Sequence, residues 1–302
     1  MQIRELKNLL KDFGNNVIFN HDLKKKNWFN IGGKSKVFYK ADNLKNLIKF
    51  LKILNNKEKI FIIGAGSNLL ISDKIFDGIV IKLGKNFNRT SLLREDVIIS
   101  GSSVLDKNLS DFAAKNLLSG FEFLSCIPGS VGGGIRMNAG CFGKEFKDIL
   151  LSIQAIDNKG NLITIPSKKI NFEYRNNDIP ENLIFLSASF RGIKSNFNKI
   201  NNEILKMKSQ KEKNQPTKIK TSGSTFKNPY KQTDKKVWEL IRESVPLDIK
   251  FGDAHISQKH SNFFVNNGNA TFEDMKKLID YVSNQVLKKT GIKLDKEIKI
   301  LE

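Results

Sequence analysis

Residues 127–140 read IPGSVGGGIRMNAG and are the strongest chemical signal in this chain, with five glycines and one proline in fourteen positions. Glycine weakens helices and strands, but it permits positive φ and leaves the backbone bare. A bare backbone lets amide N–H groups approach a phosphate closely. The pattern therefore predicts that this run is neither an ordinary helix nor an ordinary strand. It is either a phosphate-binding loop or a tight buried connection between packed elements.

A second glycine-containing loop lies in residues 61–73, which read FIIGAGSNLLISD. One apolar run enters the turn at 64–68 and another leaves it. Leu69 stands where a dinucleotide-binding fingerprint requires its third glycine, so we interpret the segment as a strand–turn–strand loop. A third small-residue loop covers residues 30–33. Three such loops between β-rich segments favour one extended polyphosphate ligand, such as a dinucleotide.

Three further side chains stand where they could act on a substrate. Arg175 precedes the turn at Pro180, Ser224 lies in the segment TSGSTFKNP, and Glu297 lies near the end of the chain. Each also has a plain structural interpretation. The arginine would be a solvated loop residue, the serine would cap its own turn, and the glutamate would be a solvated charge on a strand. Taken singly, none of the three decides a function.

The elements that must position these residues follow from the periodicity of apolar side chains, which predicts an α+β chain. We expect helices at the N-terminus, over 43–54 and over 105–118, strands over 97–101 and 183–190, a hairpin of 149–156 with 162–165, and a helix followed by a loop over 194–220. Near the end, Thr271 and Asp274 form a predicted capping box for a helix that stops at Gly291. Residues 292–301 alternate apolar and polar side chains, which predicts a half-buried strand.

Composition limits the classes of function. The chain has 302 residues and a net charge of +20, but its lysines are scattered along the whole sequence. A composition-wide bias is therefore favoured over a nucleic-acid-binding patch, although a basic surface still attracts anionic small ligands. Cys126 and Cys141 lack metal-ligand spacing and indicate free thiols in a reducing cytoplasm. We expect no signal peptide, membrane insertion, metal or obligate protein partner.

Several motifs together resemble one family. They are IGAGSNLL, GFEFLSCIPGSVGGGIRMNAG, YRNN, SGSTFKNP, KHSNFFVNNGNAT and LDKEIKIL. In order and spacing they resemble the UDP-N-acetylenolpyruvoylglucosamine reductases, from about Asn27 to Leu301. The resemblance is to the shorter class that lacks a tyrosine-bearing lid, because residues 193–220 leave no room for one.

The resemblance implies a fold and a reaction. An N-terminal helical segment (1–26) would precede an FAD-binding domain of the vanillyl-alcohol-oxidase (PCMH) type (27–192, two subdomains split near 85). An α+β substrate-binding domain (195–302) would follow. NADPH would reduce FAD, and the flavin would deliver hydride to the enolpyruvyl ether of the UDP-sugar. The product would be UDP-N-acetylmuramate, a peptidoglycan precursor made in the cytoplasm.

The resemblance also assigns roles to residues. Arg175 would pair the substrate carboxylate, Ser224 would donate a proton to the carbanion, and Glu297 would support the developing charge. Which group gives the final proton stays open. The implied FAD-binding residues are Gly64, Ala65, Gly66, Ser67, Asn68, Ile127, Pro128, Gly129, Ser130, Gly132 and Gly133. The implied substrate-binding residues are Tyr174, Lys227 and Asn228.

The sequence departs from the family pattern at a few positions. Cys126 and Gly134 stand where a glycine and an alanine are expected, and Asn27 replaces a usual threonine. Two other functions stay open on sequence alone. One is a flavin oxidase of the same fold that uses O₂. The other is a basic nucleic-acid-binding protein without flavin, which predicts strongly salt-sensitive binding.

Overall fold

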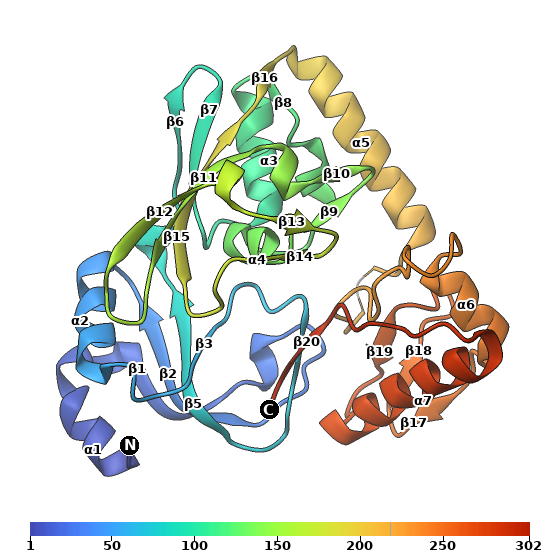
Figure 1. Cartoon of the computed structure of the whole chain (residues 1–302), viewed down its shortest axis with the longest axis horizontal. Helices are drawn as coiled ribbons and strands as arrows, with labels where there is room; N and C mark the ends of the chain where they lie inside the picture. The colour runs from blue at the N-terminus through green and yellow to red at the C-terminus, as the bar shows by residue number, and fades with distance from the viewer. Residues whose placement is uncertain (218) are drawn as a thin grey trace. The chain divides into compact units, whose positions relative to one another are not determined.

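The structure is a computed structural model that describes residues 1–217 and 219–302 (Figure 1). The chain divides into two compact units. Unit 1 comprises Met1–His21, Lys36–Ala65 and Asp77–Lys211, and unit 2 comprises Asp22–Ser35, Gly66–Phe76 and Glu212–Glu302. Among the described residues, no helix has both the length and the apolar character that a membrane span requires.

The larger sheet of unit 1 has five strands in the order β12-β11-β15-β7-β6 (Figure 1). Their bounds are β6 Thr90–Arg94, β7 Val97–Gly101, β11 Leu150–Ile156, β12 Leu162–Pro166 and β15 Ile184–Arg191. The predicted hairpin is confirmed, because β11 and β12 pair antiparallel. The Asp157 carboxylate closes its turn by accepting hydrogen bonds from the backbone N–H groups of Lys159 and Asn161. The predicted strands at 97–101 and 183–190 are confirmed within one residue at each end.

The second sheet of unit 1 has the order β1-β2-β5-β3. Its strands are β1 Val17–Asp22, β2 Lys34–Ala41, β3 Ile60–Ile62 and β5 Phe76–Leu83, and α1 Ile3–Leu9 and α2 Leu44–Leu54 accompany it. The predicted helix at 43–54 is confirmed, with the Asn43 side chain accepting from the Asn46 N–H at its start. Leu47, Phe50 and Leu51 on one face of α2 are fully buried.

Three helices and several short strands are the other named elements of unit 1. They are α3 Asp106–Lys115, α4 Val131–Arg136 and α5 Phe197–Asn214, with the short strands β8 Leu118–Ser119, β9 Gly140–Cys141, β10 Lys144–Glu145, β13 Phe172–Glu173, β14 Asn176–Asn177 and β16 Ile193–Lys194. The expected helix within 194–220 is therefore α5, and the expected helix at 105–118 is α3. Both predictions are confirmed, with shorter bounds.

The prediction that the glycine-rich run contains no ordinary helix is wrong for α4. Tertiary contacts outweigh the low helix propensity of its three glycines. Val131 N–H and Gly132 N–H donate to the carbonyls of Val104 and Ser102 at 2.9 Å. Gly134 is required by packing, since a Cβ there would lie 2.2 Å from the ring of Phe146. The ring therefore occupies the space that an alanine side chain would need.

Unit 2 contains the helices α6 Val237–Ser244 and α7 Phe272–Thr290, and the sheet β17-β18-β19 (Lys250–Phe251, Ala254–Ile256 and Phe264–Asn266) (Figure 1). The predicted capping box at Thr271 and Asp274 is confirmed, and α7 ends at Gly291 with φ 73°. The apolar face of α7 is buried, and its members are Phe272, Met275, Leu278, Ile279, Val282 and Val286.

The predicted strand over 292–301 is wrong over most of its length. Only β20, Lys299–Leu301, is a strand, and it pairs in parallel with β4, Leu69–Ile71. The preceding backbone bonds to a loop instead of a sheet, because Lys227 N–H donates to the Asp295 carbonyl and Glu297 N–H donates to the Thr225 carbonyl, each at 2.8 Å.

Candidate active site

Two of the glycine-rich loops meet directly in unit 1. Gly64 follows β3, and a Cβ added to it would lie 2.5 Å from Ser130 Oγ. Gly133 is exposed, and an added Cβ there would come no closer than 3.6 Å to that same hydroxyl. Bare backbone thus lies on both sides of one serine hydroxyl. Such an arrangement fits a phosphate group approached by amides and a hydroxyl.

The third loop is assembled in unit 2. Trp28 N–H donates to the Gly66 carbonyl at 3.0 Å, and Gly33 N–H donates to the Ser72 carbonyl at 2.8 Å. Gly66 has φ 72°, and a Cβ there would overlap the Lys26 carbonyl at 2.1 Å. Gly66 is therefore required both by its left-handed backbone and by the close approach of Lys26.

Ser67 and Asn68 are half-buried in unit 2. The Asn68 side-chain amide donates to the Glu297 carbonyl at 3.0 Å, and the Lys299 N–H donates to the Asn68 carbonyl. Asn68 therefore links the GAGSNLL loop to the C-terminal segment, a role that sequence reasoning did not foresee.

The segments that carry Ser224 and Glu297 are brought together in unit 2. Thr225 supplies the carbonyl that accepts the Glu297 N–H, and Ser224 forms an isolated β-bridge with Phe263. Asn262 fixes the same loop from its other side. Its carbonyl accepts the Thr225 N–H, and its side-chain amide exchanges hydrogen bonds with the backbone of Phe226 at 3.0 and 2.9 Å. Both Ser224 and Glu297 are half-buried.

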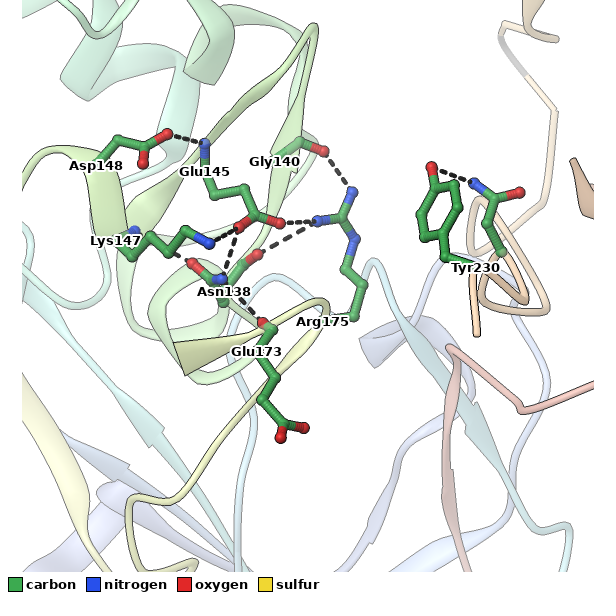
Figure 2. Close-up of polar contacts among 9 residues, drawn as sticks. Asn138, Gly140, Glu145, Lys147, Asp148, Glu173, Arg175 and Tyr230 are labelled. Atoms are coloured by element: carbon green, nitrogen blue, oxygen red, sulfur yellow. Dashed lines mark hydrogen bonds and ion pairs between the residues drawn. The ribbon is translucent and has the colours of Figure 1, made fainter. Parts of the chain in front are cut away.

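Arg175 lies in unit 1, in the turn that joins β13 to β14 (Figure 2). Its backbone has φ 54°, which is strained for a non-glycine residue. The guanidinium donates to the Asn138 carbonyl at 3.3 Å and to the Gly140 carbonyl, and it lies 3.5 Å from a Glu145 oxygen. The guanidinium also lies 4.9 Å from the centroid of the Tyr174 ring.

The remaining predicted substrate residues lie in unit 2. Lys227 and Asn228 are half-buried. The Asn228 carbonyl oxygen of the side chain accepts the Val237 N–H at the start of α6, and its amide donates to the Tyr230 hydroxyl at 3.2 Å. Lys236 lies 4.5 Å from the Tyr230 ring centroid. An exposed aromatic ring with a cation beside it therefore borders the FKNP segment.

The two cysteines are free thiols in the structure. Cys141 donates to the Phe123 carbonyl at 3.3 Å, and burial raises the pKa of its thiol to about 12. The thiol of Cys141 is therefore protonated at neutral pH. Lys211 on α5 donates its ammonium to the Cys126 carbonyl, and burial lowers the pKa of that ammonium.

Two residues around Arg175 were missed by sequence reasoning, namely Asn138 and Glu145. Asn138 is fully buried with φ 40°, and its side-chain amide donates to Glu145 Oε2 at 3.0 Å. The signal that could have found Asn138 was its place near the end of the glycine-rich run, at a position with a left-handed backbone, which asparagine tolerates well.

Comparisons with known proteins decide the family. Residues 35–166 match the family model of an FAD binding domain, and residues 215–301 match that of the C-terminal domain of UDP-N-acetylenolpyruvoylglucosamine reductase. The UDP-N-acetylenolpyruvoylglucosamine reductase of Pelagibacter ubique (strain HTCC1062) is 64% identical over 302 residues, which cover 100% of both chains. The chain belongs to the UDP-N-acetylenolpyruvoylglucosamine reductase (MurB) family.

Other MurB proteins agree with this assignment. The Rickettsia conorii (strain ATCC VR-613 / Malish 7) reductase is 43% identical over 281 residues, covering 92% of this chain and 93% of the relative. A crystal structure of MurB from Thermus caldophilus superposes with a TM-score of 0.81 at 26% identity, covering 95% of this chain and 98% of that one. The chain is therefore an FAD-binding oxidoreductase with an α+β fold, composed of a PCMH-type FAD-binding domain and a MurB C-terminal domain.

Proposed function

We propose that this MurB protein uses NADPH to reduce the enolpyruvyl ether of UDP-N-acetylglucosamine to UDP-N-acetylmuramate, in the cytoplasmic synthesis of peptidoglycan precursors. The full-length identity of 64% with a UDP-N-acetylenolpyruvoylglucosamine reductase carries the proposal. The charged and hydroxyl groups at Arg175, Ser224 and Glu297 suit the reaction chemically. The predicted domains, with boundaries near 26, 85 and 195, belong to the same proposal.

The proposed cofactor is FAD, and the residues of the glycine-rich loops fit its pyrophosphate. When bound, FAD would supply the hydride transfer between NADPH and the enolpyruvyl double bond. Gly64, Ala65 and residues 127–133 are proposed to hold the pyrophosphate, supported by the bare backbone around Ser130 Oγ. The Val131 and Gly132 N–H groups hydrogen-bond to the protein itself, so Gly133 and the Ser130 hydroxyl are the stronger candidates in this loop. Residues 66–68 are proposed to contact the same cofactor.

Arg175 is proposed to pair the substrate carboxylate. Hydride addition to the enolpyruvyl carbon pushes negative charge onto the carbon that bears the carboxylate. A guanidinium that forms hydrogen bonds to that carboxylate stabilises the enolate-like charge more than the neutral alkene. The arginine is suited to this role because backbone carbonyls and Glu145 fix its orientation before substrate binds.

Ser224 is proposed to protonate the carbanion carbon, and Glu297 to donate a hydrogen bond to the developing charge. A serine hydroxyl is a weak acid, so it serves only against a strongly basic carbon and needs a nearby group to restore its proton. The Glu297 segment and the Ser224 loop share hydrogen bonds through Thr225, which supports a common role. Tyr174, Lys227 and Asn228 are proposed substrate contacts.

The test separates the two half-reactions of purified enzyme. In a Ser224→Ala variant, flavin reduction by NADPH should keep its rate, whereas flavin reoxidation by the enolpyruvyl UDP-sugar should slow by about 10²–10⁴-fold. Ser222→Ala is the matched control, because the Ser222 hydroxyl donates to the Leu69 carbonyl at 3.0 Å and serves the fold. Equal loss in both half-reactions of Ser224→Ala would show that the serine is structural.

The same assay distinguishes the alternatives. Peroxide formation that depends on an alcohol substrate and not on the UDP-sugar would identify a flavin oxidase. A purified protein that is colourless and takes up no added FAD would refute the proposed function.

A further inference from the structure

The contacts around Arg175 form a closed polar network in unit 1 (Figure 2). Its members come from the chain that follows α4, from residues 145–148 and from the β13–β14 hairpin. The network has one centre, the Glu145 carboxylate, which is about one-fifth exposed as a side chain. One of its oxygens faces Arg175 at 3.5 Å, and the other accepts from Asn138 at 3.0 Å and from Lys147 at 2.9 Å.

Glu145 is itself held rigidly. Its backbone N–H donates to the Asp148 carboxylate at 2.9 Å in a capping box, which fixes the start of the short helix at 146–148. The Lys147 ammonium, whose pKa is raised by its hydrogen bond to Glu145, supplies a second positive charge. The carboxylate thus lies between two cations, and this arrangement holds it in one orientation.

Asn138 joins Glu145 to the hairpin. The Asn138 side chain donates to the Glu173 carbonyl at 3.0 Å and accepts the Lys147 N–H at 3.1 Å. Its backbone carbonyl accepts from the Arg175 guanidinium. Every hydrogen bond of this buried amide therefore ends on a segment that touches Arg175 or Glu145. A displacement of Glu145 would be transmitted to the arginine through two routes, one direct and one through Asn138.

The network holds Arg175 in a strained backbone conformation and orients its side chain. A non-glycine residue at φ 54° is energetically unfavourable, and it persists only where surrounding contacts hold it. Because the arginine occupies the hairpin turn, its side chain would otherwise sample many rotamers. The Glu145 carboxylate and the two carbonyls select one orientation of the guanidinium plane.

We propose that Glu145 is a positioning residue for the reductase reaction, acting through Arg175 with Asn138 as its second link. The inference rests on the proposed function, since it concerns the arginine assigned there to the substrate carboxylate. Glu145 itself does not touch substrate in this proposal. It fixes the guanidinium plane that binds the substrate carboxylate. The enolpyruvyl double bond is thereby held in the orientation in which it accepts hydride.

The experiment is a double-mutant cycle measured on FAD-loaded enzyme by stopped-flow absorbance. Glu145→Gln keeps the side-chain shape and removes the charge. Flavin reoxidation by the enolpyruvyl UDP-sugar should slow by about 10²-fold, the cost of a misplacement near 1 Å. Flavin reduction by NADPH, FAD content and Tm should stay at wild-type values. In an Arg175→Ala background, Glu145→Gln should have no further effect on reoxidation. With Arg175 present, Glu145→Asp should keep part of the rate that Glu145→Gln loses.

Glu173→Gln is the matched control, because it makes the same chemical change within the hairpin. The Glu173 side chain contacts Asn176 at 3.4 Å and points away from Arg175 (Figure 2). It should keep the wild-type reoxidation rate. An equal loss from Glu145→Gln with and without Arg175, or a loss of FAD and Tm together, would overturn the positioning role. Wild-type enzyme whose flavin the UDP-sugar fails to reoxidise would instead refute the proposed function.

Discussion

Asp106 is a buried acid with no hydrogen-bond partner for either carboxylate oxygen among the residues that the structure describes. It is the first residue of α3 and has no solvent exposure. Its backbone N–H donates to the Gly129 carbonyl at 3.2 Å, so it lies directly behind the proposed pyrophosphate loop. Burial raises the pKa of its carboxyl well above the ordinary value of 3.8. We expect Asp106→Asn to stabilise the protein in a pH-dependent way.

The size of the effect follows from proton linkage. In the unfolded chain the carboxyl ionises near its ordinary pKa, whereas the folded protein keeps it protonated to a higher pH. The stability that the group contributes is therefore fully present below pH 3.8 and is lost as pH rises toward the folded pKa. One proton changes the free energy of unfolding by about 1.4 kcal/mol per pH unit. Asparagine does not titrate, so its advantage over aspartate should grow with pH between about pH 5 and pH 7, by at most about 1.4 kcal/mol for each pH unit.

Urea unfolding of FAD-saturated protein, followed by circular dichroism across this pH range, measures the difference. Asp111→Asn is the matched control, since Asp111 is exposed on the same helix, and its effect should stay within about 0.5 kcal/mol at every pH. A stability gain for Asp106→Asn that does not change with pH would refute the reasoning. It would mean that the folded protein holds the carboxylate ionised.

Two further predictions concern the glycine-rich loops. Gly134→Ala should destabilise the protein by about 1–3 kcal/mol, because its Cβ would overlap the Phe146 ring at 2.2 Å. Phe146→Leu should reduce that penalty when the two changes are combined. Thermal unfolding of the two single variants and the double variant checks this prediction, and strictly additive losses of stability would contradict it. Gly64→Ala should weaken FAD retention, because its Cβ would lie 2.5 Å from Ser130 Oγ and displace that hydroxyl. Flavin absorbance after gel filtration checks this, and unchanged flavin content in Gly64→Ala would contradict it.

Local signals in the sequence predicted much of the fold because they act over a few residues. The capping box at Thr271, the αL stop at Gly291 and the hairpin of 149–156 with 162–165 all depend on residues close together in sequence. The helix α4 was not predictable from such signals, since its glycines disfavour a helix and its hydrogen bonds come from Ser102 and Val104.

The residues of the candidate site were also predicted only in part. Arg175 and Ser224 were named through motifs, but the partners that orient Arg175 were not. Asn138 lies 37 residues from Arg175 in sequence, and only the fold brings its carbonyl to the guanidinium. The last segment was predicted as a strand from its alternation. The burial of Leu294 and Ile298 agrees with that pattern, but the backbone partner is the loop at 225–227.

Unit 2 combines early and late segments of the chain, and this limits the order in which the chain can fold during synthesis. Phe29, Ile31 and Leu70 belong to a core whose other members begin at Phe226. The Asn68 side chain bonds to the Glu297 carbonyl across 229 residues of sequence. The core around these early residues is complete only once Ile298 has been synthesised, whereas both cores of unit 1 are complete in sequence well before it. A nascent chain therefore carries an apolar segment around Phe29 that lacks most of its native core partners until the residues beyond Phe226 have been synthesised. Slow, non-local closure of this kind exposes such a segment to chaperones and to aggregation.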